Sequence, residues 1–188
     1  MDNSYNDVLD IVRSLGIFQV FAAFTPVLAG TFPLGIATAT SDADIICNVS
    51  NHAEFTKLLC EKFGQYQDFT VRQTEKYSQM VTIASFYAPC GANNQTLRIE
   101  IFGTAQSVWE QNAVRHLFVE ARLLWAWEDV TGNDAARKEI RRLKEGGIRT
   151  EPAFAQFFGI LGEPYSALLS LSEATDGELR RIIMNVSA

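Results

Sequence analysis

The sequence predicts an α+β fold, in which a mixed β-sheet with flanking helices precedes a C-terminal half made of helices alone. Residues 1–104 alternate short apolar runs with helical segments, whereas residues 105–188 keep a helical period throughout. The 188 residues are 47% apolar and 20% charged, which is enough to bury a substantial core. We therefore expect an α/β core over 1–104 and a helical region over 105–188, packed together as one structural unit.

The first region is expected to begin with a helix, followed by strands and one further helix. Apolar residues at helical spacing place the first helix within Asp2–Phe24, and Gly64 is a suitable C-terminal cap for a helix over His52–Gly64. Short apolar or alternating runs bounded by turn residues predict the strands, and the turn-rich APCGANNQ makes the last two an antiparallel hairpin. The expected strands are Thr25–Thr31, Asp42–Val49, Phe69–Tyr77, Met80–Tyr87 and Thr96–Phe102.

The second region shows apolar stripes at helical spacing, separated by turn signals. One stripe runs through Val114 and Leu117, and another through Phe154, Phe157 and Phe158. We interpret the phenylalanine stripe as core, since it has helical spacing in an acidic protein. Turns are expected at Thr131–Asn133, Gly146–Gly147, Gly162–Pro164 and Asp176–Gly177.

Charge and cysteine usage limit the classes of partner. The chain has 16 Lys and Arg against 22 Asp and Glu, a net charge of -6, which argues against nucleic acid and anionic membranes as main partners. The three cysteines form no C-x-x-C pair, which favours a reducing, cytoplasmic location over a disulfide framework. Leu15–Ser41 lacks charge, but Pro26, Pro33 and three glycines interrupt it, so we expect no membrane span.

Acidic residues gather at the start of one expected strand. Asp42 and Asp44 flank Ala43, and side chains alternate along a strand, so both carboxylates should project from the same face. Two like charges on one face are relieved by raised pKa values or by a bound cation, of which Mg²⁺ is the simplest. Glu100 lies on the polar face of a later strand and is a candidate third acid, although a surface pairing with Arg98 would also explain it.

A glycine and a threonine precede this acidic pair by ten residues. Gly30 allows close approach of the backbone to a phosphate, and Thr31 offers its hydroxyl. Pro33 stands where a short helix could begin, because proline is tolerated in the first turn of a helix. The segment therefore has the composition of an anion-binding turn.

The stretch LAGTFPLGIATATSDADII resembles the signature of the polymerase-β-like nucleotidyltransferase superfamily. That signature places Gly and a small or hydroxyl residue about ten positions before an Asp-x-Asp framed by apolar residues, with Gly-Ser or Gly-Gly where this chain has Gly30-Thr31. The later stretches NAVRHLFVEARLL and GIRTEPAFA resemble a family of small bacterial single-domain proteins of unknown function within the same superfamily. The resemblance implies a polymerase-β-like fold for the first region.

The resemblance also implies a chemistry. Asp42 and Asp44 would ligate two Mg²⁺ ions, and Glu100 would share one ion or act as a base. Gly30, Thr31 and Ser41 would contact a nucleoside triphosphate such as ATP. A nucleoside monophosphate would then pass to a hydroxyl of a small molecule or a protein. Two alternatives remain: a non-catalytic nucleotide- or metal-binding module, and an enzyme acting on nucleic-acid ends, which would need a basic channel.

The helical region adds three weaker candidates. His116 and Glu120 stand four residues apart, which places them on one helix face, either as an exposed pair or lining an acceptor pocket. No third ligand at metal-binding spacing accompanies them, so the sequence does not indicate zinc. The basic segment Arg137–Arg149 is expected to be a solvated helix face, with Arg149 standing apart as a candidate phosphate contact.

Overall fold

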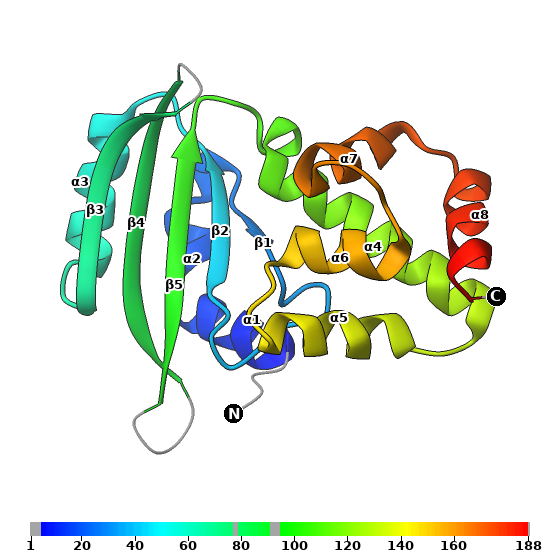
Figure 1. The fold of residues 1–188 in the computed structure, drawn as a ribbon. Helices are drawn as coiled ribbons and strands as arrows, with labels where there is room; N and C mark the ends of the chain where they lie inside the picture. Colours follow the sequence, from blue (N-terminus) through cyan, green and yellow to red (C-terminus); the bar gives the residue numbers. More distant parts are fainter. Residues whose placement is uncertain (1–4, 77–78, 91–94, 188) are drawn as a thin grey trace.

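The computed structural model describes residues 5–76, 79–90 and 95–187, and it contains a five-stranded mixed sheet (Figure 1). The strand order is β1-β2-β5-β4-β3. Strands β2 and β5 run parallel, and all other neighbours run antiparallel. The expected α+β class and the pairing of the last two strands are thus confirmed. The strands are β1 Val27–Ala29, β2 Ala43–Asn48, β3 Gln67–Lys76, β4 Gln79–Cys90 and β5 Gln95–Thr104.

One face of the sheet carries the main hydrophobic core. Ile45 of β2 and Ile99 and Ile101 of β5 are fully buried there, packed with apolar residues of the N-terminal helices and α3. Because successive strand residues point to opposite faces, Asp44 and Glu100 lie on the other face. The helices on the core face are α1 Tyr5–Ser14, α2 Ile17–Val20 and α3 His52–Phe63, with the short helix η1 Ala22–Phe24.

The second half of the chain is a helical group beside the β1 edge of the sheet (Figure 1). Its core includes Phe154 and Phe158, both buried, which confirms that part of the phenylalanine stripe is core. The start of α4 closes over the sheet, where Val114 packs against Ala29 and Ile46. The helices are α4 Asn112–Thr131, α5 Ala135–Glu145, α6 Thr150–Phe158, α7 Pro164–Ser170 and α8 Asp176–Ser187, with short helices η2 Val108–Glu110 and η3 Leu171–Glu173.

The segment between β1 and β2 joins the two halves. Leu34 and Ile36 are buried in the core of the helical group rather than in that of the sheet. Helix α5 fixes the same segment: Arg137 donates a hydrogen bond to the Leu34 carbonyl, and the Lys144 ammonium donates to the Ile36 carbonyl at 3.1 Å. The segment that leads into β2 and its acidic residues is therefore held both by apolar packing in the helical group and by hydrogen bonds from α5.

Two local predictions are wrong, and one is confirmed with a shorter helix. No helix begins at Pro33, because Gly35 and Ile36 donate backbone hydrogen bonds to Phe32 and Thr31 and close tight turns instead. The first helix expected within residues 2–24 is confirmed as α1, which ends at Ser14 before Gly16 with its left-handed φ of 66°; residues 2–4 lie outside the described chain. Residues 176–177, expected as a turn, form the first turn of α8.

Two expected segments are only partly described. Residue 77, at the end of one expected strand, and residues 91–94 of the expected hairpin turn lie outside the described chain. Among the described residues, no helix combines the length and the apolar character needed to cross a bilayer.

Candidate active site

A cleft of about 690 Å³ lies between the sheet and the helical half. Two sets of polar residues face each other across it. We call the set Gly30, Thr31, Asp44 and Glu100 the sheet wall. We call the set His116, Glu120, Thr150 and Glu151 the helical wall.

The sheet wall is built by the register of two parallel strands. Asp44 of β2 and Glu100 of β5 are direct partners, so their side chains leave the same face of the sheet at the same level. Gly30 follows β1 and has a left-handed φ of 73°. A Cβ at Gly30 would overlap the Oδ2 atom of Asp44, so only glycine leaves room for this carboxylate.

Asp42 lies just before β2 and joins the sheet wall through an arginine. The Arg98 guanidinium forms ion pairs with Asp42 and, at 3.2 Å, with Oε1 of Glu100. Asp42 and Ser41 line a smaller adjoining cavity of about 260 Å³ rather than the main cleft. The Ser41 hydroxyl accepts a hydrogen bond from the backbone N–H of Thr38 at 2.9 Å, so it stabilises the loop.

Electrostatics favour a cation on the sheet wall. Burial, followed by the charges of Glu100 and Asp42, raises the pKa of Asp44 to about 7. Arg98 and Lys144 act in the opposite direction but do not offset these effects. Three carboxylates with one arginine form an oxygen-rich, net negative set, which is the donor chemistry that Mg²⁺ prefers.

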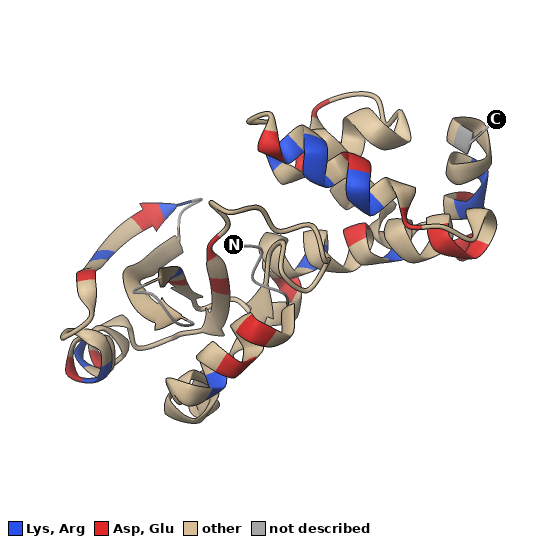
Figure 2. Cartoon of the chain, turned by 90° about the horizontal axis from the view of Figure 1, so that it is seen from below, with Lys and Arg blue, Asp and Glu red and all other residues tan. Residues whose placement is uncertain are grey.

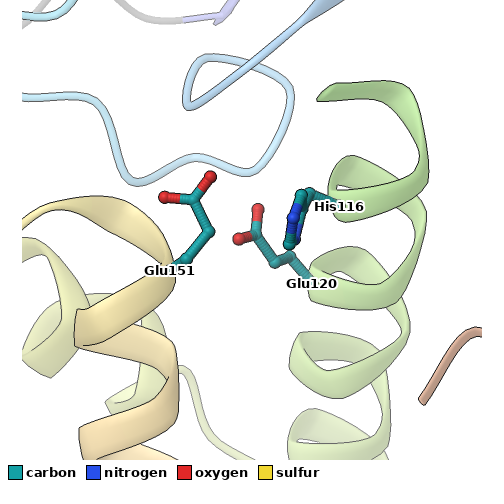
Figure 3. Close-up of side chains that lie close together, drawn as sticks. All are labelled: His116, Glu120 and Glu151. Carbon is teal, nitrogen blue, oxygen red and sulfur yellow. The ribbon is translucent and has the colours of Figure 1, made fainter. Parts of the chain in front are cut away.

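Of the two alternatives for His116 and Glu120, the exposed pair is wrong, and both residues line the cleft. His116 and Glu120 of α4 are 6% and 3% exposed, and Glu151 in the first turn of α6 points toward them (Figure 3). One donor atom from each of the three side chains lies within 4.8 Å of the others. Burial, then the Glu151 charge, raises the pKa of Glu120 well above its usual range, while burial lowers the pKa of His116. Sequence spacing missed Glu151, because it comes from another helix.

The basic segment is only partly a solvated face, although Figure 2 shows a concentration of basic residues on α5. Burial lowers the pKa of Lys144 to about 8, and its charge interacts with Glu120, Glu151 and Asp44. Arg149, the candidate phosphate contact, is exposed and does not line the main cleft. Lys144 does not line the cleft either, but its charge acts on these three acids. The sequence analysis did not single it out, because its place at the end of an amphipathic helix gave no signal.

The fold is similar to solved nucleotidyltransferases of the polymerase-β-like type. The chain matches a cytoplasmic RNA terminal U-transferase (TM-score 0.51, 10% identity, 85% of this chain and 42% of that one). It matches the Cid1 poly(U) polymerase (TM-score 0.52, 10% identity, 89% and 49%) and a structure of the GLD-2/RNP-8 complex (TM-score 0.54, 14% identity, 98% and 78%). The chain thus spans less than half the length of the first two structures.

Residues 10–171 match the family described as "Domain of unknown function (DUF4269)". Because this match covers most of the chain, the protein belongs to that family. No curated protein sequence matches the chain. The fold class thus agrees with the resemblance seen in the sequence, and the family supplies no substrate.

Proposed function

We propose that the protein is a Mg²⁺-dependent nucleotidyltransferase that moves a nucleoside monophosphate from a nucleoside triphosphate to a hydroxyl of a small molecule or a protein. One observation carries the proposal. Asp44 and Glu100 share one level of the sheet, with Asp42 linked through Arg98 and Gly30 shaped around the Asp44 carboxylate. The likeness to nucleotidyltransferase folds supports it.

In this proposal, Asp42 and Asp44 hold Mg²⁺, and Glu100 shares one ion or acts as the base. The metal would supply charge neutralisation for the phosphates and the leaving group. The backbone at Gly30 and the hydroxyl of Thr31 bind phosphate oxygens of the triphosphate. The acceptor hydroxyl oxygen bonds to the α-phosphorus while the bond from that phosphorus to the bridging oxygen of the β-phosphate breaks, releasing pyrophosphate. As the base, Glu100 takes the hydroxyl proton on a carboxylate oxygen, and Arg98 orients this carboxylate.

We propose a small-molecule or protein acceptor rather than nucleic acid. Two of the similar structures are described as an RNA terminal U-transferase and a poly(U) polymerase, so an RNA end is the competing acceptor for this fold. The net charge of -6 disfavours a polyanion, because affinity for phosphate backbones comes largely from Lys and Arg. Salt-dependent binding of a single-stranded RNA oligonucleotide would contradict this part of the proposal.

A specific observation also favours a non-catalytic nucleotide- or metal-binding module as a second candidate. Arg98 ion-pairs with two of the three acids, so the sheet wall is partly neutralised by the chain itself. A protein that only senses a nucleotide or supports a partner would not need Glu100 as a base. The variant Glu100→Gln separates the two, because an enzyme would lose turnover and keep nucleotide binding, whereas a module would show no turnover to lose.

Calorimetric titration with each nucleoside triphosphate, with and without Mg²⁺, tests the proposal. We expect Mg²⁺-dependent binding of at least one nucleotide, and its loss in Asp42→Asn/Asp44→Asn. Asp129→Asn is a matched control, because Asp129 forms an exposed ion pair with Arg180 outside the cleft. Absence of nucleotide binding by the folded wild-type protein would contradict the proposal.

A further inference from the structure

The helical wall contains a cluster that the proposed transfer reaction does not use. His116 and Glu120 are one turn apart on α4, and Glu151 approaches them from the first turn of α6 (Figure 3). One nitrogen or oxygen donor from each lies within 4.8 Å of the others. Bound to one zinc ion in a tetrahedral arrangement, such donors would be about 3.4 Å apart. Small side-chain rotations would therefore bring all three onto one ion.

Buried polar atoms without a partner point to a ligand at this cluster. In the described part of the chain, three buried side-chain nitrogen or oxygen atoms lack a hydrogen-bond partner: His116 Nδ1, Glu120 Oε1 and Gln111 Oε1. All three residues line the cleft. Leaving such groups unpaired inside a protein is costly, so they are normally satisfied by a ligand, an ion or water. Two of the three belong to the His116, Glu120 and Glu151 cluster.

The lysine that interacts with this cluster does not satisfy these atoms. Lys144 interacts electrostatically with Glu120 and Glu151, but its ammonium donates a hydrogen bond to the Ile36 carbonyl at 3.1 Å. The other wall of the cleft already has its own cation, Arg98, paired with Asp42 and Glu100. The helical wall therefore holds two carboxylates and an imidazole without a direct ion pair among the described residues.

We propose that His116, Glu120 and Glu151 bind one divalent transition-metal ion, with Zn²⁺ the best fit, at a site separate from the proposed Mg²⁺ site. An imidazole nitrogen suits zinc and similar ions, whereas Mg²⁺ prefers oxygen ligands throughout. Two carboxylates balance the charge of a divalent ion in this buried position. Three protein ligands leave a fourth position, which the lining of the cleft makes accessible to a bound molecule.

Zinc titration of the chelator-treated full chain tests the site, with Cys60→Ser as the background because Cys60 is an exposed thiol. We expect one equivalent of Zn²⁺ to bind. The zinc affinity of both His116→Gln and Glu151→Gln should be lower by at least about tenfold. His52→Gln is the matched control, since His52 is the other histidine of the chain and its Nδ1 pairs with the Thr82 hydroxyl at 2.8 Å. The control should bind zinc with unchanged affinity.

A second pair of variants separates this site from the sheet wall. Asp44→Asn should keep zinc binding and lose Mg²⁺-dependent nucleotide binding, so the two proposals can fail independently. Zinc affinity that is unchanged in His116→Gln and Glu151→Gln, or lost only in Asp44→Asn, would overturn the zinc site. Equal competition by Mg²⁺ would overturn the transition-metal assignment. Glu151→Gln is the safer variant for folding because Glu151 is only half-buried, and circular dichroism melting checks both variants.

Discussion

Both walls of the cleft bury acidic side chains, but they differ in how the charges of these side chains are compensated. On the sheet wall, Glu100 shares an arginine with Asp42, and burial raises the pKa of Asp44 to about 7. On the helical wall, His116 and Glu120 are buried with unpartnered atoms and no direct ion pair within the described ranges of the chain. The acids of the sheet wall are thus partly neutralised by the chain itself, whereas the helical wall carries a desolvation cost that a bound ion would relieve.

The two walls also differ in the secondary structure that positions their acidic residues. Asp44 and Glu100 come from neighbouring strands whose ladder fixes them at one level. Glu120 and Glu151 come from two helices and meet only through tertiary packing. Substitutions that change the backbone conformation should therefore disturb the sheet wall most. Substitutions that change only a side chain should disturb the helical wall most.

The largest effect is expected at Gly30, where the backbone and the sheet wall meet. Gly30→Ala should lower the free energy of unfolding by about 2–4 kcal/mol, because alanine is strained at a φ of 73° and its Cβ must displace the Asp44 carboxylate. Mg²⁺-dependent nucleotide binding should weaken at least about tenfold. Denaturant unfolding and calorimetry measure both.

Gly132→Ala is the control for the Gly30 substitution. Gly132 has a φ of 69°, but nothing lies within 4 Å of the position that a Cβ would take, so this substitution bears only the backbone strain, about 1–2 kcal/mol. Its nucleotide binding should be unchanged. Equal effects of the two substitutions on binding would show that Gly30 does not shape the Asp44 site.

Asp44→Asn should stabilise the ligand-free protein, and the gain should depend on pH. Its pKa is raised from 3.8 to about 7, so between these values the unfolded chain loses a proton that the folded protein keeps. The free energy of unfolding of the wild type therefore falls as pH rises from about 4 to 7. The variant does not show this fall, because asparagine does not titrate. We expect a gain of about 1–3 kcal/mol at pH 8 that vanishes near pH 4, measured by urea unfolding.

Glu120→Gln makes the matching test on the helical wall. Burial raises the pKa of Glu120, so this carboxylate, like that of Asp44, lowers the stability of the folded protein as pH rises. Replacing it should therefore add about 1 kcal/mol of stability above neutral pH in the presence of a chelator. Added Zn²⁺ should reverse the order, because only the wild type gains from a bound ion. A variant that stays more stable than the wild type in saturating zinc would contradict the site.

The smallest effect is expected outside both walls. Arg142→Gln removes an ion pair with Glu139 on α5, where both side chains are exposed and the two atoms are 2.6 Å apart. Such surface pairs contribute little, so the variant should unfold at nearly the same temperature as the wild type. Thermal unfolding checks this, and a large drop in the midpoint would show that this face of α5 supports the fold.

The sheet wall could be predicted from the sequence because its signals are local. Alternation puts Asp42 and Asp44 on one face of their strand and Glu100 on the polar face of another, and the glycine spacing points to the turn beside them. What the sequence could not provide is the register that makes Asp44 and Glu100 direct partners. It also raised the pairing of Glu100 with Arg98 only as an alternative to a site role, whereas the structure combines the pairing with a place in the cleft.

The helical wall could be predicted only in part. Helical spacing put His116 and Glu120 on one face, but their burial depends on how α7 packs against both α4 and α6. Glu151 and Lys144 looked like ordinary surface charges of helix ends, and no local pattern tied them to His116. The helix expected at Pro33 does not form. Leu34 and Ile36 are buried in the core of the helical group, and the segment closes tight turns instead.

A crystal structure with Mn²⁺ and a non-hydrolysable nucleoside triphosphate would test the proposed function at atomic level, since Mn²⁺ can replace Mg²⁺ and is located by its anomalous signal. We expect an anomalous peak between the Asp44 and Glu100 carboxylates, with the phosphates beside Gly30 and Thr31. A nucleotide bound elsewhere, or Mn²⁺ found only at His116, Glu120 and Glu151, would contradict the assignment of the sheet wall as the site of nucleotidyl transfer.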